Sequence, residues 1–224
     1  MANMFDSQND TNKKYDFQSG ASNKSESLNN GKHVSPIVSF MPPKPVVLVG
    51  LMGSGKTSIG KRLAKRFDLP FCDSDQEVED AAGCAIGDID SVFGEGALQE
   101  GELKVISRLI NQCVQIIATG CLSFTYEDTR RYIKEHAISV WLKGDLETLL
   151  LRVTGKKDRP LLEAGKEKEI LEKMIDDYYP LLEESDVTVT TLDEPAGITV
   201  DRVIIAISDF IKSTYPDYHI LRSV

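Results

Sequence analysis

The chain of 224 residues carries 26 basic and 35 acidic side chains, which gives a formal net charge of −9 at pH 7. We therefore expect no nucleic-acid partner, because neutralising phosphates requires a basic face. With 41% hydrophobic and 27% charged residues, the composition is that of a globular α/β protein of about one domain. No apolar run approaches the roughly 18 to 20 residues of a membrane helix, so no membrane partner is expected.

The N-terminal sequence lacks the apolar core of a secretory signal, and it contains acidic residues but no arginine, unlike an organelle transit peptide. A cytoplasmic monomer is the expectation. The cysteines form no CxxC pair, and no histidine stands at zinc-ligand spacing from them, which favours reduced thiols over a metal site or disulfides. They are Cys72, Cys84, Cys113 and Cys121.

The chain is expected to divide near Pro42. Residues 1–41 are rich in Asn, Ser, Gln and Lys and show no periodicity, which predicts a disordered tail. The alternative for the tail is a docking arm that uses Phe5, Tyr15 and Phe17. Residues 42–224 are predicted to form one folded domain.

From Pro45 onward, apolar runs alternate with helical patterns, which predicts a parallel sheet of about five strands with helices packed on its faces. Strands are predicted at residues 46–49, 115–118, 138–142 and 187–190. A further strand is predicted to begin at residues 71–72. Helices with predicted bounds lie at residues 56–67, 76–82, 97–112 and 200–213. In the third of these, a core-facing stripe is predicted at Leu103, Ile106, Ile110 and Cys113.

Residues 50–57, GLMGSGKT, match the phosphate-binding pattern GxxxxGK[ST] between a predicted strand and a predicted helix. Glycines let successive backbone N–H groups point at phosphate oxygens, and the helix N-terminus adds partial positive charge. Lys56 is expected to reach the β and γ phosphates of ATP, and Thr57 to be a Mg²⁺ ligand. The other predicted nucleotide contacts are Gly53, Ser54, Gly55 and Ser58. The alternative is a glycine-rich turn with an exposed lysine.

Asp73 and Asp75 follow the second predicted strand, at the edge of the sheet where ligands bind in doubly wound folds. Asp73 can orient Mg²⁺, and Asp75 can take a proton from an acceptor hydroxyl in phosphoryl transfer. Equally, either carboxylate can cap the helix that is predicted to begin near Gln76. On these residues alone, both interpretations stay open.

Four further motifs follow the P-loop in a recognisable order: DSD at 73–75, AIGDI at 85–89 before FGE at 93–95, ATG at 118–120 and DRPLL at 158–162. In this order they resemble the shikimate kinases over about residues 45–190. The resemblance implies a three-layer α/β/α P-loop domain, similar to nucleoside-monophosphate kinases. It also implies transfer of the γ-phosphate of ATP to the 3-hydroxyl of shikimate, a step in aromatic amino acid biosynthesis.

By this resemblance, Asp75 would bind and deprotonate the acceptor hydroxyl, Asp73 would support Mg²⁺, and Gly120 would face the substrate. Arg159 would reach the ATP phosphates from a lid at residues 154–166, whose closure excludes water. The alternative for Arg159 is a solvated loop charge.

Departures from the family pattern fall on the acceptor side. Gln99 stands where the family has an arginine that holds the shikimate carboxylate, and Tyr178 stands where a second arginine is expected. Cys121 and Leu122 replace two glycines after Gly120, which is expected to reshape the pocket. We therefore expect weaker or altered acceptor binding and intact nucleotide binding.

Other cations near these elements are expected on solvated helix faces rather than in the pocket; they are Lys104, Arg108, Arg130 and Arg131. The sequence thus predicts an ATP- and Mg²⁺-dependent phosphotransferase with shikimate or a similar small molecule as acceptor. The alternatives are a kinase for another small hydroxylated acceptor and an ATP-binding protein without kinase activity. Cys121 is either a thiol that borders the site or a buried inert cysteine.

Overall fold

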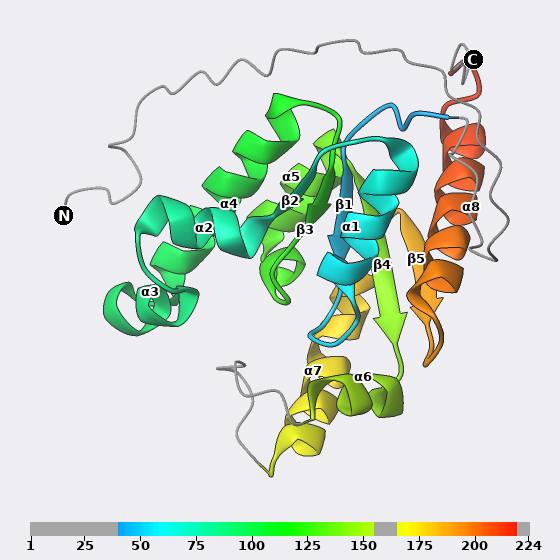
Figure 1. The fold of residues 1–224 in the computed structure, drawn as a ribbon. Coiled ribbons are helices and arrows are strands. Elements are labelled where there is room, and N and C mark those ends of the chain that lie inside the picture. The colour runs from blue at the N-terminus through cyan, green and yellow to red at the C-terminus, as the bar shows by residue number, and fades with distance from the viewer. Residues whose placement is uncertain (1–39, 155–164, 219–224) are drawn as a thin grey trace, which may run out of the picture. The chain divides into compact units, whose positions relative to one another are not determined.

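The computed structural model describes residues 40–154 and 165–218. Within them a five-stranded, all-parallel sheet has the strand order β2-β3-β1-β4-β5 (Figure 1). The strands are β1 (Val46–Val49), β2 (Phe71–Asp73), β3 (Ile116–Ala118), β4 (Ile138–Gly144) and β5 (Val187–Thr191). The predicted strands are confirmed, with ends that differ by one or two residues.

The helices that connect these strands are α1 (Lys56–Phe67), α2 (Ser74–Ala82), α3 (Ile86–Phe93), α4 (Glu95–Gln112), the 3₁₀ turn η1 (Ser123–Thr125), α5 (Glu127–His136), α6 (Leu146–Val153), α7 (Glu167–Leu182) and α8 (Ala196–Thr214). The predicted helix over residues 56–67 agrees with α1. Helices α2, α4 and α8 begin two to four residues earlier than predicted. Bounds were not predicted for α3, α5, α6 and α7.

Alternate residues of the sheet pack against opposite helical layers. Val46 and Leu48 of β1 lie in a core with α1 and α8, whereas Val47 and Val49 lie in a core with α2, α4, α5, α6 and α7. All four valine and leucine side chains of β1 are fully buried, as expected for the central strand of a parallel sheet. The three-layer α/β/α fold is therefore confirmed.

The predicted stripe on α4 is partly wrong. Ile106 and Ile110 are buried as predicted, but Leu103 is only half-buried and Cys113 is exposed. Cys113 follows the last helical residue with an extended backbone (φ −167°, ψ 171°), so the helical spacing no longer applies to it. The buried face also includes Glu102, Val105 and Leu109.

The described part of the chain begins inside the predicted tail. Phe40 is 7% exposed, and its ring meets that of Phe67 edge-on at a centroid distance of 5.2 Å. The remainder of the tail, residues 1–39, lies outside the described residues. Among the described helices, none combines the length and apolarity that crossing a membrane requires.

We predict that Phe67→Ala lowers the free energy of unfolding by about 3–5 kcal/mol, because the ring is fully buried and its removal leaves a cavity. Chemical denaturation followed by circular dichroism measures the change. Lys65→Ala, an exposed position on the same helix, is the control and is expected to change stability by no more than about 0.5 kcal/mol. Equal effects of the two substitutions would contradict the packing described here.

Candidate active site

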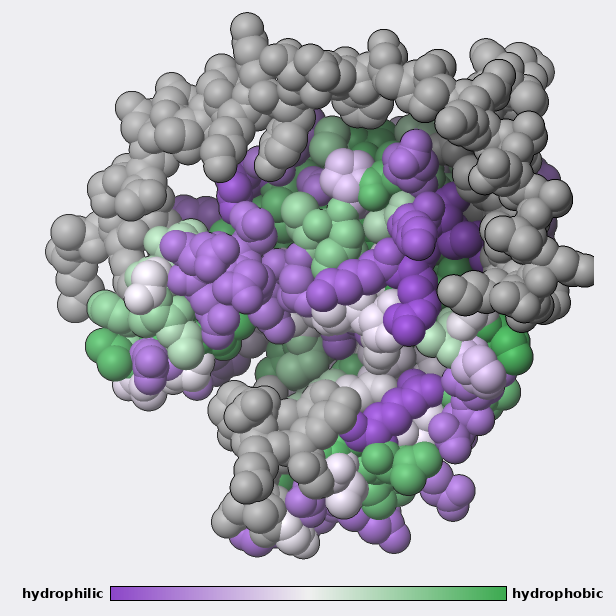
Figure 2. Space-filling model, in the orientation of Figure 1, coloured by the Kyte–Doolittle hydropathy of each residue, from purple (hydrophilic) through white to green (hydrophobic). Residues whose placement is uncertain are grey.

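A cavity of about 1370 Å³ opens at the carboxyl ends of the strands. The P-loop, the end of β2, helices α3 and α4 and the loop after β3 line it. In Figure 2, hydrophilic residues gather over α1 and α2 on the viewed face, while the region of α3 is more hydrophobic. This is the edge at which open parallel sheets bind ligands.

The P-loop between β1 and α1 has the backbone of an anion-binding loop. Gly53 and Gly55 have φ values of 79° and 96°, and Gly55 is the N-cap of α1. These positive φ values turn the backbone inward in a way that side-chain-bearing residues rarely adopt. The Ser54 hydroxyl is buried and has no hydrogen-bond partner among the described residues. A buried donor without a protein partner fits a loop that binds phosphate oxygens.

Lys56 and Thr57 open α1 beside the cavity. The Lys56 ammonium donates hydrogen bonds to the carbonyl oxygens of Gly50 at 2.6 Å and Leu51 at 3.2 Å, so it lies folded over the loop. The Thr57 hydroxyl donates to Oδ2 of Asp73 at 2.9 Å. The predicted contact Ser58 also lines the cavity, and its hydroxyl accepts a hydrogen bond from Arg62 at 2.7 Å.

Asp73 takes the capping role that the sequence left open, and it also contacts the P-loop helix. It is the N-cap of α2, where its Oδ1 accepts a hydrogen bond from the Asp75 backbone N–H at 3.3 Å. Its other oxygen faces the P-loop through Thr57. The capping carboxylate therefore also joins the two phosphate-side elements of the cavity, and α2 begins at Ser74, earlier than predicted.

Asp75 lies in the first turn of α2 and lines the cavity. Burial, together with the negative charge of Asp73, raises the pKa of its carboxyl group to about 6, whereas Lys56 opposes the shift. A carboxylate with a raised pKa beside a P-loop is suited to accept a proton from a hydroxyl group.

Gly120, in the loop after β3, lies where the acidic groups of the cavity converge. A Cβ atom at this position would lie 2.6 Å from Asp75 Oδ1, 2.8 Å from Ser123 Oγ and 3.0 Å from Glu102 Oε1. The first two distances are shorter than real Cβ contacts and the third is unusually tight, so a side chain here would displace the Asp75 and Ser123 oxygens and press on Glu102. The structure thus brings the predicted Gly120 and Asp75 together.

Glu102 of α4 is a cavity residue that the sequence analysis missed. It is 5% exposed, and its Oε1 accepts a hydrogen bond from the Ser123 hydroxyl at 3.1 Å. Burial and the neighbouring Asp75 raise the pKa of its carboxyl group to about 7. A charged residue between apolar positions of an amphipathic helix is the signal that could have singled it out.

The four departures from the family pattern occupy different places. Cys121 and Leu122 are among the residues that line the cavity. Burial raises the pKa of the Cys121 thiol. Gln99 does not line the cavity, and its amide donates to Glu95 Oε1 at 3.0 Å. Tyr178 is half-buried and packs against the hydrophobic core to which α4 and α7 contribute.

Arg152, at the end of α6, is a second residue that the sequence analysis missed. Its guanidinium lines the cavity and donates to the carbonyl oxygens of Gly53 at 3.3 Å and Leu192 at 2.5 Å. It therefore brings a positive charge next to the P-loop. Arg159 and most of the predicted lid lie outside the described residues.

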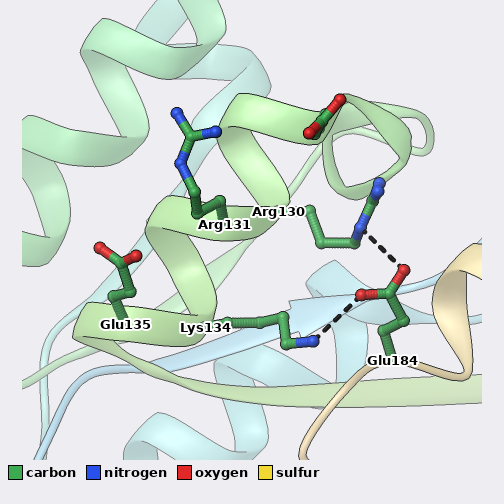
Figure 3. Close-up of a pocket in the computed structure, with 6 residues that line it drawn as sticks. Arg130, Arg131, Lys134, Glu135 and Glu184 are labelled. Atoms are coloured by element: carbon green, nitrogen blue, oxygen red, sulfur yellow. Dashed lines mark hydrogen bonds and ion pairs between the residues drawn. The ribbon is translucent and has the colours of Figure 1, made fainter.

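A smaller cavity of about 340 Å³ lies on α5 (Figure 3). Glu184 accepts from Arg130 at 3.2 Å and from Lys134 at 3.0 Å, so one carboxylate bridges the two cations. Arg131 pairs with Asp128 at 2.6 Å. Figure 3 shows Arg130 and Lys134 of α5 directed toward Glu184, with dashed lines marking the two contacts.

The four cations expected on solvated helix faces lie outside the large cavity, although Arg130 is part-buried rather than solvated, with its side chain 14% exposed. Lys104 pairs with Glu100 at 3.0 Å, and Arg108 pairs with Glu77 at 2.7 Å. Neither these residues nor Arg130 and Arg131 line the large cavity. Lys56 and Arg152 are the cationic side chains among the described residues that do.

Comparison with known proteins agrees with the geometry. The family model described as shikimate kinase matches residues 52–208. The chain belongs to the shikimate kinase family. The shikimate kinase of Rhodopseudomonas palustris is 40% identical over 180 residues, covering 80% of this chain and 89% of the relative. That of Paramagnetospirillum magneticum is 44% identical over 171 residues, covering 76% of this chain and 88% of the relative.

A solved structure of a shikimate kinase from Acinetobacter baumannii in complex with shikimate is also similar. It superposes with a TM-score of 0.71 at 30% identity, covering 75% of this chain and 94% of that one. The family predicted from the motifs is therefore confirmed, and with it the class of enzyme, an ATP-dependent small-molecule kinase.

For the shikimate kinase-like site, we predict that Gly120→Ala lowers kcat about 10- to 100-fold, because the new Cβ displaces Asp75 from its position and presses on Glu102. ATP affinity is expected to change little, since the P-loop is not touched. Gly96→Ala on α4, where a Cβ meets nothing within 4 Å, is the control. Steady-state kinetics compare the variants, and an equal loss in both would refute the crowding argument.

Proposed function

We propose that the chain transfers the γ-phosphate of ATP to the 3-hydroxyl of shikimate. The observation that carries the proposal is the position of Asp75: its half-buried carboxylate lines the same cavity as the P-loop and interacts electrostatically with Lys56. Membership of the shikimate kinase family and the similarity to a shikimate-bound structure support shikimate as the acceptor.

In the proposed reaction, the acceptor oxygen forms a bond to the γ-phosphorus while the bond to the β,γ-bridging oxygen breaks. Asp75 accepts the hydroxyl proton, and ADP leaves with the electrons of the broken bond. The P-loop N–H groups and Lys56 stabilise the negative charge on the phosphate oxygens. Arg152 adds a positive charge on the same side of the cavity.

The residues beside the P-loop fit a magnesium ion. Thr57 Oγ1 and Asp73 Oδ2 lie 2.9 Å apart and both are oxygen donors, the type that Mg²⁺ prefers. Mg²⁺ commonly uses one or two protein oxygens together with phosphate and water oxygens. We infer that these two residues hold it, directly or through water, and that it supplies charge neutralisation on the phosphates. Arg159 remains the proposed contact from the lid.

The acceptor side lacks the two arginines that the family pattern has, since Gln99 pairs with Glu95 and position 178 is a tyrosine. Charge-assisted hydrogen bonds contribute about 1.5–3 kcal/mol each, so the KM for shikimate is expected to be high. The nucleotide side keeps every P-loop group. The proposed enzyme therefore binds ATP normally and shikimate weakly.

The test is ADP release by the purified protein with ATP and Mg²⁺ while shikimate is titrated into the millimolar range. We expect saturable turnover that Lys56→Met lowers by at least about 100-fold, because the phosphate charge loses its cation. Lys56→Arg keeps the charge and serves as the matched variant. If ATP binds but shikimate leaves the rate of ADP release unchanged, shikimate is not the acceptor.

Asp75→Asn keeps the shape of the side chain and removes its basicity. We expect kcat to fall by about 10²- to 10⁴-fold, the usual contribution of a general base. The affinity for ATP, measured by calorimetry, should remain, because Asp75 does not belong to the P-loop. A variant that keeps wild-type kcat would show that Asp75 is not the base.

A further inference from the structure

Glu102 has an unused hydrogen-bonding atom that borders the active-site cavity. The side chain is 5% exposed, and Oε1 accepts from Ser123 Oγ, but Oε2 is buried without a hydrogen-bond partner within residues 40–154 and 165–218. Burying a polar atom unpaired costs free energy, so such atoms in a ligand cavity point to the ligand as partner.

We propose that Glu102 binds the acceptor as a neutral acid, donating a hydrogen bond from Oε2 to an oxygen of the anionic acceptor. The inference rests on the proposed function, because it concerns the binding of shikimate at the same site. Glu102 is then a binding residue that acts beside Asp75, which receives the reacting hydroxyl.

The position of Gly120 shows how close the two carboxyl groups are. One Cβ atom at this glycine would lie 2.6 Å from Asp75 Oδ1 and 3.0 Å from Glu102 Oε1, so both groups border the same small volume. An acceptor held by Asp75 therefore comes within reach of Glu102. Gly120 and Ser123 keep the two carboxyl groups in this arrangement.

The excess negative charge of the cavity requires that Glu102 bind an anionic acceptor in its neutral form. Its acidic side chains outnumber Lys56 and Arg152 among the described lining residues; they are Asp73, Asp75, Glu79, Asp90, Glu95, Glu102 and Glu194. An anionic acceptor that met an ionised Glu102 here would be repelled, whereas a neutral carboxyl group offers an O–H donor. Burial, with the charge of Asp75, raises the pKa of Glu102 to about 7, so the neutral form is accessible near neutral pH.

The other titratable groups around Glu102 do not interfere with a measurement of its protonation between pH 7 and 9. Asp75, on α2, has a pKa of about 6 and is ionised above pH 7. The Cys121 thiol and the Tyr126 hydroxyl both have raised pKa values and remain neutral between pH 7 and 9. Asp90 of α3 and Glu95 of α4 are the other acidic residues on these two helices that line the cavity.

The test is the KM for shikimate between pH 7 and 9 in wild type and Glu102→Gln. Neutral Glu102 is present below its pKa and disappears above it, so the wild-type KM should rise, by roughly tenfold between pH 8 and 9. The glutamine can accept from Ser123 through its oxygen and still donate from nitrogen, so its KM should stay nearly constant. Titration of the nucleotide would affect both proteins equally.

Glu95→Gln is the matched control, because it also removes one carboxylate from α4 and from the cavity but leaves Glu102 intact. It should keep the pH-dependent rise of the KM. A wild-type KM that is constant from pH 7 to 9, or a rise that persists in Glu102→Gln, would overturn the role of Glu102 while leaving shikimate turnover established.

Calorimetry of shikimate binding gives a second readout on the wild type alone. At pH 8, Glu102 should take up close to one proton when the acceptor binds. This uptake is seen as a binding enthalpy that depends on the ionisation enthalpy of the buffer. Binding without proton uptake contradicts the inference on Glu102. If shikimate neither binds nor stimulates ADP release at any pH, the proposed function and this inference both fail.

Discussion

The hydrogen bond between Thr57 Oγ1 and Asp73 Oδ2, 2.9 Å long, joins the two halves of the site. Asp73 also caps α2, so one carboxylate relates the P-loop helix to the helix that carries Asp75. The parallel sheet brings both helices to one edge, and this contact links them directly through their side chains. In-line phosphoryl transfer depends on such alignment, since small displacements of reacting groups cost large factors in rate. In the proposed reaction, the cap is therefore part of the geometry that aligns Asp75 with the phosphates.

Local patterns predicted the position of the P-loop and the bounds of α1. The P-loop is a contiguous motif whose strand and helix can be recognised on either side, and α1 agrees with its predicted bounds. Glu102 and Arg152 were missed for the opposite reason. Each acts on residues far along the chain, Glu102 on Ser123 and Arg152 on Gly53. Such contacts exist only after the helices have packed on the sheet. The helical pattern could have singled out Glu102 as a charge between apolar positions, but no local spacing indicates which partner either residue meets.

Helix α4 shows, within one element, the same limit of what a local sequence pattern can predict. Its apolar periodicity predicted the helix, but the predicted stripe ended on Cys113, which lies beyond the last helical turn. The helix instead buries an acidic residue, Glu102, because α4 lies between the core and the acceptor cavity. Periodicity describes a helix with one apolar face, and it cannot distinguish a face that packs on a core from one that borders a cavity.

The absence of the two family arginines, at positions 99 and 178, changes the ionisation expected for a carboxyl group on the acceptor side of the cavity. An arginine in the cavity would hold an adjacent carboxylate ionised, because an opposite charge favours the charged form. Without that partner, burial and Asp75 dominate, and the proton on Glu102 becomes available at neutral pH. A buried carboxyl group that would repel an anion can then donate a hydrogen bond to it. The same substitutions that remove a cationic clamp thus create the conditions for recognition by a neutral acid, at the expense of binding at alkaline pH.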